Sequence, residues 1–327
     1  MNLRNRVAAG IFWGIHVPLF PLMAVGYVLV VVKMLVYSRA SHASATVLAS
    51  FVTRWMQHQL GTRRDVPCAR LMRVLPNVSP LGMRLFAGPT LLARDLTGYV
   101  PRTYRYPYPG VPPMSDQPAA RTTFFDTALA RHLADIDQLV ILGAGLDTRS
   151  YRLPAGSPVR CFEVDTPWTQ PFKRTMLKRA GIDTTGVTYV AADFEQEDWF
   201  EKLVAAGFEP NARTFFLWEA VTPYLDRAAV ESTLRKIAGT APGSVVAFDY
   251  FSTELLADRS LFWRYARVVL KLIGEPMSTF GLDNTPPACK HAAAFVESCG
   301  LSLEEHRTFG QETTQKRAQA GFAVATV

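Results

Sequence analysis

The chain has 327 residues, of which 49% are hydrophobic and 19% are charged, enough for one large domain with an additional segment. Its net charge of +7 is unevenly spread: residues 1–120 carry thirteen Lys/Arg and three Asp/Glu, a surplus of ten, whereas the remainder has three more acidic than basic residues. The four cysteines are scattered and form neither a CxxC pair nor a Cys/His cluster, which argues against a structural metal and favours a reducing compartment.

The first forty residues contain a long apolar run. Val7–Tyr37 is interrupted only by His16 and Lys33, and Gly10–Val32 reaches roughly the 20 residues that a membrane-spanning helix needs. Beside such a run, the basic surplus favours phospholipid headgroups over nucleic acid as a partner, with a solvated basic face as the alternative. We therefore predict that residues 1–40 form an apolar membrane anchor or interfacial helix, and that residues 7–37 associate with a membrane.

The mode of attachment has three interpretations. The length of the run favours a spanning or inserted anchor, while an interfacial or buried helix and a cleaved signal peptide are the alternatives. Basic residues after the run slightly outnumber those before it, which places the main domain in the cytoplasm.

Residues 41–120 are interpreted as a helical and Pro/Tyr-rich cap region. Within Ala45–Leu60 the apolar residues recur near helical spacing, which predicts a helix. Arg102–Pro118 is rich in tyrosine, and the five prolines between Pro107 and Pro118 predict an extended loop.

From residue 121 onward, strand-like and helix-like runs alternate, which indicates an α/β domain over residues 121–327 with a mostly parallel sheet. The last two strand-like runs predict a closing antiparallel pair. The expected helices are Arg121–Ala134, Leu261–Leu272 and His291–Cys299, and the expected strands are Leu139–Leu142, Val159–Val164, Val187–Ala191, Thr214–Trp218, Ser244–Phe251, Leu301–Thr308 and Ala320–Val327.

A glycine pair follows the first expected strand. Gly143 and Gly145 allow a backbone to approach a ligand closely, and Glu163, twenty positions after Gly143, is placed to accept hydrogen bonds from ribose hydroxyls. A nicotinamide cofactor requires a third glycine, for close packing near a pyrophosphate, where this chain has Thr148. S-adenosylmethionine has no pyrophosphate, so the pattern favours a methyltransferase over a nicotinamide-dependent oxidoreductase, which is the alternative.

Carboxylates recur at the ends of successive expected strands. Glu163 and Asp165 end the second, Asp193-Phe194 follows the third, and Glu219 follows the fourth. Ligands of such sheets bind outside the carboxyl ends of the strands, so these residues are expected to surround a cofactor, with Asp193 and Phe194 next to its adenine.

The motifs GAGLDTR at Gly143–Arg149, FEVD at Phe162–Asp165, ADF at Ala192–Phe194 and WEAVTPYL at Trp218–Leu225 resemble those of the leucine carboxyl methyltransferase family. The resemblance is closest to its bacterial branch of S-adenosylmethionine-dependent O-methyltransferases and covers Arg121–Val327. It implies a Rossmann-like class I methyltransferase sheet, mostly parallel with an antiparallel last strand.

The resemblance also implies roles for single residues. Arg121 matches an arginine that faces the methionine carboxylate of the cofactor, and Glu219 matches a cofactor-side acid. The glycine turn corresponds to Gly143 and Gly145. Glu195 stands where members that methylate a peptide carboxylate carry an arginine, which disfavours a protein C-terminus as the acceptor. The remaining implied contacts are the ribose acids Glu163 and Asp165 and the adenine pair Asp193 and Phe194.

The sequence thus predicts transfer of a methyl group from S-adenosyl-L-methionine to a carboxylate or hydroxyl of a small or lipid-like molecule. Tyr224 and Arg149 are candidates for positioning the acceptor, although an arginine after such a turn often serves a structural ion pair. A non-catalytic membrane scaffold that keeps the fold is a further alternative. No metal and no nucleic acid are expected, and the sequence predicts no oligomeric state.

Overall fold

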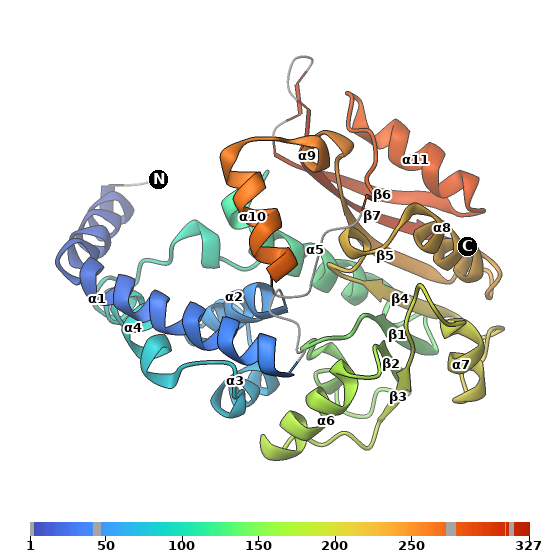
Figure 1. The fold of residues 1–327 in the computed structure, drawn as a ribbon, viewed down its shortest axis with the longest axis horizontal. Coiled ribbons are helices and arrows are strands. Elements are labelled where there is room, and N and C mark those ends of the chain that lie inside the picture. The colour runs from blue at the N-terminus through green and yellow to red at the C-terminus, as the bar shows by residue number, and fades with distance from the viewer. Residues whose placement is uncertain (1–2, 42–46, 273–278, 311, 314–316) are drawn as a thin grey trace.

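The computed structural model describes residues 3–41, 47–272, 279–310, 312–313 and 317–327. A twisted sheet with helices on both faces lies beside a group of helices from the first hundred residues (Figure 1).

The sheet has seven strands in the order β3-β2-β1-β4-β5-β7-β6. The first five are parallel to one another, whereas β7 is antiparallel to both of its neighbours. This confirms the mostly parallel sheet with an antiparallel last strand. The strands are β1 Gln138–Leu142, β2 Arg160–Asp165, β3 Val187–Ala191, β4 Thr214–Trp218, β5 Val245–Phe251, β6 Ser302–Phe309 and β7 Ala320–Thr326.

Strand register brings the predicted site residues to one edge. Leu142 of β1 pairs with Val164 of β2, and Asp165 pairs with Ala191 of β3. On the other side, Ile141 pairs with Leu217 of β4. The residues that follow these pairs therefore emerge together at the carboxyl edge, where the strand order reverses between β1 and β4.

Alternating strand residues bury two apolar layers. Val140 and Leu142 face a core with α7 Trp199–Ala205, α8 Arg227–Ala238 and α11 Ala288–Ser298. Leu139 and Ile141 face the opposite core, which contains α5 Gln117–His132. Adjacent strand residues point to opposite faces of the sheet, and helices cover both faces. Continuous apolar runs therefore correctly predicted these strands.

The cap contains α2 Val47–Gln59, α3 Val66–Val74 and α4 Pro80–Thr97. Its core includes Leu71 and Met83 together with Leu177 of α6 Thr169–Arg179, so cap and sheet domain share one apolar cluster. The prediction of a helix over 45–60 is confirmed by α2 from Val47, while residues 45 and 46 lie outside the described part. The Pro/Tyr-rich segment is mainly irregular, with short turns η1 Arg102–Tyr104 and η2 Met114–Asp116.

α1 Leu3–Ser41 is a single helix of 39 residues. Within Leu3–Tyr37 an 18-residue window reaches a mean hydropathy of 2.3, and the stretch is long enough to cross a membrane, a property shared with signal sequences. The helix bends partway along its length (Figure 1) and contains Pro18 and Pro21, which accounts for the bend. The helical N-terminal extension is confirmed.

The remaining elements are η3 Arg149–Tyr151, η4 Thr222–Tyr224, α9 Thr253–Ala257 and α10 Leu261–Leu272. Between β1 and β2, where every residue is described, the helical element is η3. The glycine turn therefore leads into a short turn and not into a full crossover helix.

Candidate cofactor and active site

The chain turns sharply where β1 ends, at Gly143 and Gly145. Their φ angles are 65° and 40°, in the left-handed region that favours glycine. A Cβ atom at Gly143 would lie 2.2 Å from Cγ2 of Val221, in the loop that follows β4. Gly143 is therefore required both by the backbone conformation and by the close approach of a neighbouring loop.

Asp165, the last residue of β2, holds this turn. Its Oδ2 accepts the N–H of Gly145 at 2.6 Å, and its Oδ1 accepts the N–H of Thr166 at 2.7 Å. Burial raises the pKa of the Asp165 carboxyl group by more than these hydrogen bonds lower it. The carboxylate thus joins the ends of β1 and β2 at the edge of the sheet.

Glu163 precedes Asp165 by two residues and lies on the same face of β2. Its Oε2 is 2.7 Å from Nζ of Lys173 in α6 and accepts the hydroxyl of Tyr151 at 3.1 Å. Burial raises the pKa of Glu163 although the Lys173 ammonium opposes the change. Its other oxygen, Oε1, is buried and has no hydrogen-bond partner among the described residues.

Asp193 and Phe194 follow β3 and are half-buried. Asp193 shapes the local turn, since its Oδ1 accepts the N–H of Glu195 at 2.9 Å. The Phe194 ring lies 5.8 Å from the ring of Trp199 and 6.4 Å from that of Trp218. The pair therefore presents a carboxylate and an aromatic ring at the same edge of the sheet.

Glu219 follows β4, and its side chain is 5% exposed. Its Oε2 is 2.6 Å from Nη1 of Arg149, and its Oε1 is 3.8 Å from Nη2 of Arg54. The next residue, Ala220, has φ of 62°, an unusual conformation for a residue with a Cβ atom, and its N–H donates to Oδ1 of Asp249 at 2.6 Å. Backbone strain is thus held at this edge by a buried carboxylate.

Arg121 connects the cap to the sheet. It lies in α5 with its Nε 3.0 Å from Oδ2 of Asp249, while its Nη1 donates to the hydroxyl of Ser50 in α2 at 3.2 Å. Burial raises the pKa of Asp249, and the guanidinium of Arg121 opposes that change. Arg121 and Glu219 are therefore linked through Asp249 and Ala220.

Arg149 is buried among carboxylates. Its Nε lies 2.7 Å from Oδ1 of Asp126, and its Nη1 pairs with Asp147 and with Glu219. Its buried Nη2 has no hydrogen-bond partner among the described residues. This arrangement favours the structural ion pair over acceptor positioning, the two interpretations that the sequence left open.

Arg149 belongs to a larger set of buried charges between cap and sheet domain, which we call the buried charge network. Arg63 reaches Asp126 at 2.7 Å and Asp65 at 2.5 Å, and Arg54 reaches Asp147 at 3.3 Å. The four arginines balance the four acids. The members are Arg54, Arg63, Asp65, Asp126, Asp147, Arg149, Arg152 and Glu219.

The arginines favour the ionised form of three acids of this network. Burial alone would raise the pKa of Asp126, but the guanidiniums of Arg149 and Arg63 outweigh it, and the pKa lies far below its ordinary value. The same balance lowers the pKa of Asp147, through Arg149 and Arg54, and that of Asp65. Asp126, Asp147 and Asp65 are therefore ionised at neutral pH.

Tyr224 lies half-buried in η4, just after the strained residue that follows Glu219. His132 lies at the far end of α5 from Arg121, where its Nε2 is 3.2 Å from Glu304, which agrees with a surface histidine. No group of three His, Cys, Asp or Glu among the described residues could hold a metal ion.

Several residues of this site were not singled out from the sequence. Asp249 sits near the end of β5, and the strand-end pattern used for the other acids would have found it. Lys173 and Arg54 lie within helices, and no local pattern distinguishes them from surface cations, because their partners come from distant parts of the chain.

The sheet order and the glycine turn with its strand-end acids define a Rossmann-like class I methyltransferase fold. Residues 101–238 match the family model described as leucine carboxyl methyltransferase. The resemblance inferred from the motifs is confirmed, and all predicted cofactor and acceptor residues lie inside the matched segment.

Similar proteins carry provisional names as S-adenosyl-L-methionine-dependent methyltransferases. One from Frankia alni is 39% identical over 142 residues, which cover 42% of this chain and 50% of the relative. One from Mycolicibacterium gilvum is 32% identical over 183 residues, which cover 55% and 57%. The chain spans about half the length of the curated relatives it matches. These relatives agree with the predicted cofactor and do not favour a nicotinamide-dependent oxidoreductase.

Among solved structures, a magnesium protoporphyrin IX methyltransferase from Synechocystis is 13% identical with a TM-score of 0.41, covering 69% of this chain and 90% of the other.

Proposed function

We propose that this protein is an S-adenosyl-L-methionine-dependent O-methyltransferase acting on a carboxylate or hydroxyl of a small or lipid-like molecule. The observation that carries the proposal is the turn at Gly143 and Gly145, bonded to Asp165 at the carboxyl edge of the sheet and contained in the family-matched segment.

The unpartnered polar atoms of the site fit this cofactor. Its methionyl end is a zwitterion, whose ammonium needs acceptors and whose carboxylate needs donors. Glu219 Oε1 is a buried acceptor without a hydrogen-bond partner among the described residues, and Arg149 Nη2 and Arg54 Nε are buried donors in the same condition. Buried polar atoms are costly when unpaired, so a ligand that pairs them is favoured.

We assign the cofactor contacts by position. Arg121 and Glu219 would bind the methionyl end, and Glu163 with Asp165 would bind the ribose. Asp193 and Phe194 would contact the adenine, and Gly143 and Gly145 would allow the backbone to approach. The division into an anchor over 1–40, a cap over 41–120 and a catalytic domain over 121–327 is part of the same proposal.

The bound cofactor would supply an electrophilic methyl group on a sulfonium. The chain would then need to hold an acceptor oxygen in line with that group and exclude water, so orientation supplies much of the rate. A carboxylate acceptor is ionised at neutral pH and needs no general base, since the ordinary pKa of a carboxyl group is about 4. Tyr224 is the proposed acceptor-positioning group, while Arg149 is assigned the structural ion-pair role described above.

We further propose that the protein associates with a membrane through residues 7–37, with its catalytic domain in the cytoplasm. The support is the apolar helix α1, which exposes many large hydrophobic side chains, lacks acidic residues and carries arginines near its start. A lipid-like acceptor would be reached from that location.

Calorimetry tests the cofactor. Purified protein should bind S-adenosylmethionine, and Asp165→Ala should weaken binding by about tenfold or more, because a charged hydrogen-bond partner of the site is lost. Glu201→Gln removes an exposed carboxylate of α7 and serves as the control, with affinity expected to stay unchanged. Binding of a nicotinamide dinucleotide in place of S-adenosylmethionine would overturn the proposal.

Methyl transfer is tested by mass spectrometry of lipid and metabolite extracts incubated with protein and cofactor. A species heavier by one methylene unit should form with the protein and be absent with the Asp165→Ala variant. Normal cofactor binding without any methylated species would instead favour the non-catalytic scaffold.

A further inference from the structure

α1 does not stand apart from the protein but lies along α4 in the opposite direction (Figure 1). Nε2 of His16 lies 3.1 Å from Oγ1 of Thr90, and the ring of Tyr27 lies 6.0 Å from that of Phe86. Successive residues of α1 therefore meet earlier and earlier residues of α4, so the apolar run is packed sideways against the cap over much of its length.

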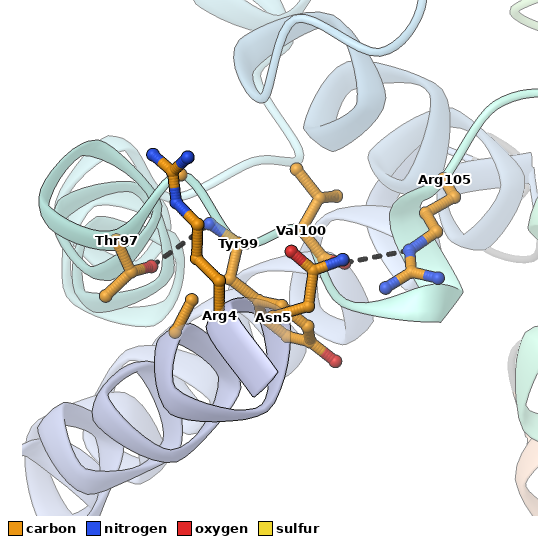
Figure 2. A pocket seen from close by; sticks show the side chains of 8 residues that line it. Arg4, Asn5, Thr97, Tyr99, Val100 and Arg105 are labelled. Carbon is orange, nitrogen blue, oxygen red and sulfur yellow. Dashed lines mark hydrogen bonds between the residues drawn. The ribbon is translucent and has the colours of Figure 1, made fainter. Parts of the chain in front are cut away.

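The two helices also meet at the start of α1. There Arg4 and Asn5 face Thr97, Tyr99 and Arg105 across a hollow of about 420 Å³ (Figure 2). The contact thus extends to the last turn of α4 and the residues that follow it.

The contact between α1 and α4 is closest at a pair of glycines, where a larger side chain would not fit. A Cβ atom at Gly26 would lie 2.4 Å from the backbone nitrogen of Phe86, and one at Gly82 would lie 3.0 Å from the carbonyl oxygen of Gly26. Close approach of two helix backbones through small residues is typical of helix pairs that form in lipid. His16, the polar residue within the apolar run, is turned toward α4 and bonds there.

Much of the remaining surface of α1 is apolar and uncovered. Trp13 and Tyr27, residues that favour the membrane–water interface, are 54% and 57% exposed. Next to α1, α4 exposes Leu92 and Leu96 at 50% and 67%. The exposed aliphatic and phenyl side chains of α1 include Ile11, Val17, Phe20, Val25, Val28 and Val32.

A helix held in this way cannot cross a bilayer alone. If α1 spanned the membrane while packed on α4, Arg84, Arg94 and Asp95 of α4 would enter the hydrocarbon with it, and charged side chains there are costly. The far side of α4 packs on the cap, with Met83 and Ala87 in the same cluster as α3. The cap helices that pack on α4 would then have to enter the membrane as well.

The charges of α1 match an anionic surface. Arg4, Arg6 and Lys33 lie on the helix, and the first acidic residue of the whole chain is Asp65. Basic residues near an apolar helical surface are attracted by anionic phospholipids.

We propose that α1 lies in the plane of one anionic membrane leaflet, bound to α4 on one side and to lipid chains on the other, and does not span the bilayer. This inference rests on the proposed membrane association and is independent of methyl transfer. It selects the interfacial arrangement among the alternatives that the sequence left open.

Maleimide labelling in reconstituted vesicles distinguishes the arrangements. Leu3→Cys marks the start of α1, and the exposed native Cys289 of α11 marks the side on which the sheet domain lies. With an impermeant reagent, an in-plane helix predicts equal labelled fractions at both positions in every preparation. A spanning helix predicts complementary fractions, and that result would overturn the proposal.

A matched glycine pair tests the role of α4. Gly26→Leu should separate α1 from α4 and strongly reduce disulfide formation in the His16→Cys/Thr90→Cys variant bound to vesicles. Gly14→Leu, where a Cβ atom would meet nothing within 4 Å, should leave that cross-link intact. An equal effect of both changes, or no cross-link in the unchanged helix, would contradict the packing.

Vesicle flotation tests the charge argument. The protein should bind vesicles containing phosphatidylglycerol about tenfold more tightly than vesicles of phosphatidylcholine alone. Equal binding to both, or self-association without binding to either, would overturn the proposal. Cofactor binding measured on the same protein would remain normal in that case, which separates this failure from failure of the methyltransferase assignment.

Discussion

At the carboxyl edge of the sheet, single residues are constrained by their backbone φ angle and by the close approach of neighbouring loops. Gly143 combines a left-handed φ with the close approach of Val221, whereas Gly156 has a φ of 76° and open space around it. Ala220 adopts a similar φ although it has a Cβ atom, and Asp249 holds its N–H. The edge where ligands bind in this fold is thus built at some conformational cost.

Gly143→Ala and Gly156→Ala separate the two constraints. Gly156→Ala should lower the free energy of unfolding by about 1–2 kcal/mol, the cost of a left-handed residue with a Cβ atom. Gly143→Ala should cost a further 1–3 kcal/mol or so, because the methyl group meets Val221. Urea denaturation followed by circular dichroism measures both. Equal losses would show that the contact with Val221 relaxes freely.

Helices of the cap are joined to the sheet domain through buried charges as well as through the shared apolar cluster. α2 contributes Arg54 and Ser50, and α5 contributes Arg121 and Asp126, so the contact between these helices ends in the buried charge network. Removing one member leaves its partners charged and buried, which is far more costly than losing an ion pair in water.

Asp126→Asn should therefore destabilise the protein strongly. We expect a loss of about 3 kcal/mol in the free energy of unfolding, since Arg63 and Arg149 lose a shared partner. The control is Glu209→Gln, which breaks an exposed ion pair with Arg160 and should cost less than about 1 kcal/mol. Thermal or urea unfolding measures both. Similar losses would show that the network is hydrated in solution.

At the scale of the whole molecule, six buried carboxylates fall into two groups with opposite effects on stability. The pKa of Asp126, Asp147 and Asp65 is lowered on folding, so they contribute stability above their unfolded values, and this is lost as the pH falls below about 4. The pKa of Asp165 and Asp249 is raised by burial, as is that of Glu163. These groups cost stability at neutral pH, and protonation removes that cost.

The free energy of unfolding should consequently have a maximum in mildly acidic solution. It should rise as the pH falls through the raised pKa values of Asp165, Asp249 and Glu163, while these groups take up protons, and then fall steeply below about 4. Urea denaturation over this range measures the profile. Asp249→Asn should flatten the limb nearer neutrality, and a monotonic decline from neutral pH in the unchanged protein would contradict the assignment.

Local patterns were sufficient for the strands and for the edge that carries the site. Val187–Ala191 and Thr214–Trp218 match β3 and β4, because buried parallel strands are short apolar runs ended by polar residues. The acids after those runs had to share one edge, since parallel strands all end on the same side. Nearby residues alone set these features.

α4 shows where local patterns fail. Pro80 begins it and Pro89 lies inside it, and a proline within a helix is locally unfavourable because it removes a backbone hydrogen bond. The helix is held by Ser79 at its start, by Gly98 at its end and by α1 along its side. The packing of α1 comes from contacts between residues about fifty or more positions apart, which no local window contains.

Composition and motif order in this chain were enough to indicate a methyltransferase fold, its glycine turn and an apolar, basic first helix. Folding in three dimensions was needed to pair Glu163 with Lys173, to surround Arg149 with three carboxylates and to lay α1 against α4. The physical reason is how far apart in the sequence the interacting residues lie. Backbone conformation and strand direction follow from neighbouring residues, whereas the partner of a buried charge or of a helix face is brought to it only when distant segments pack together.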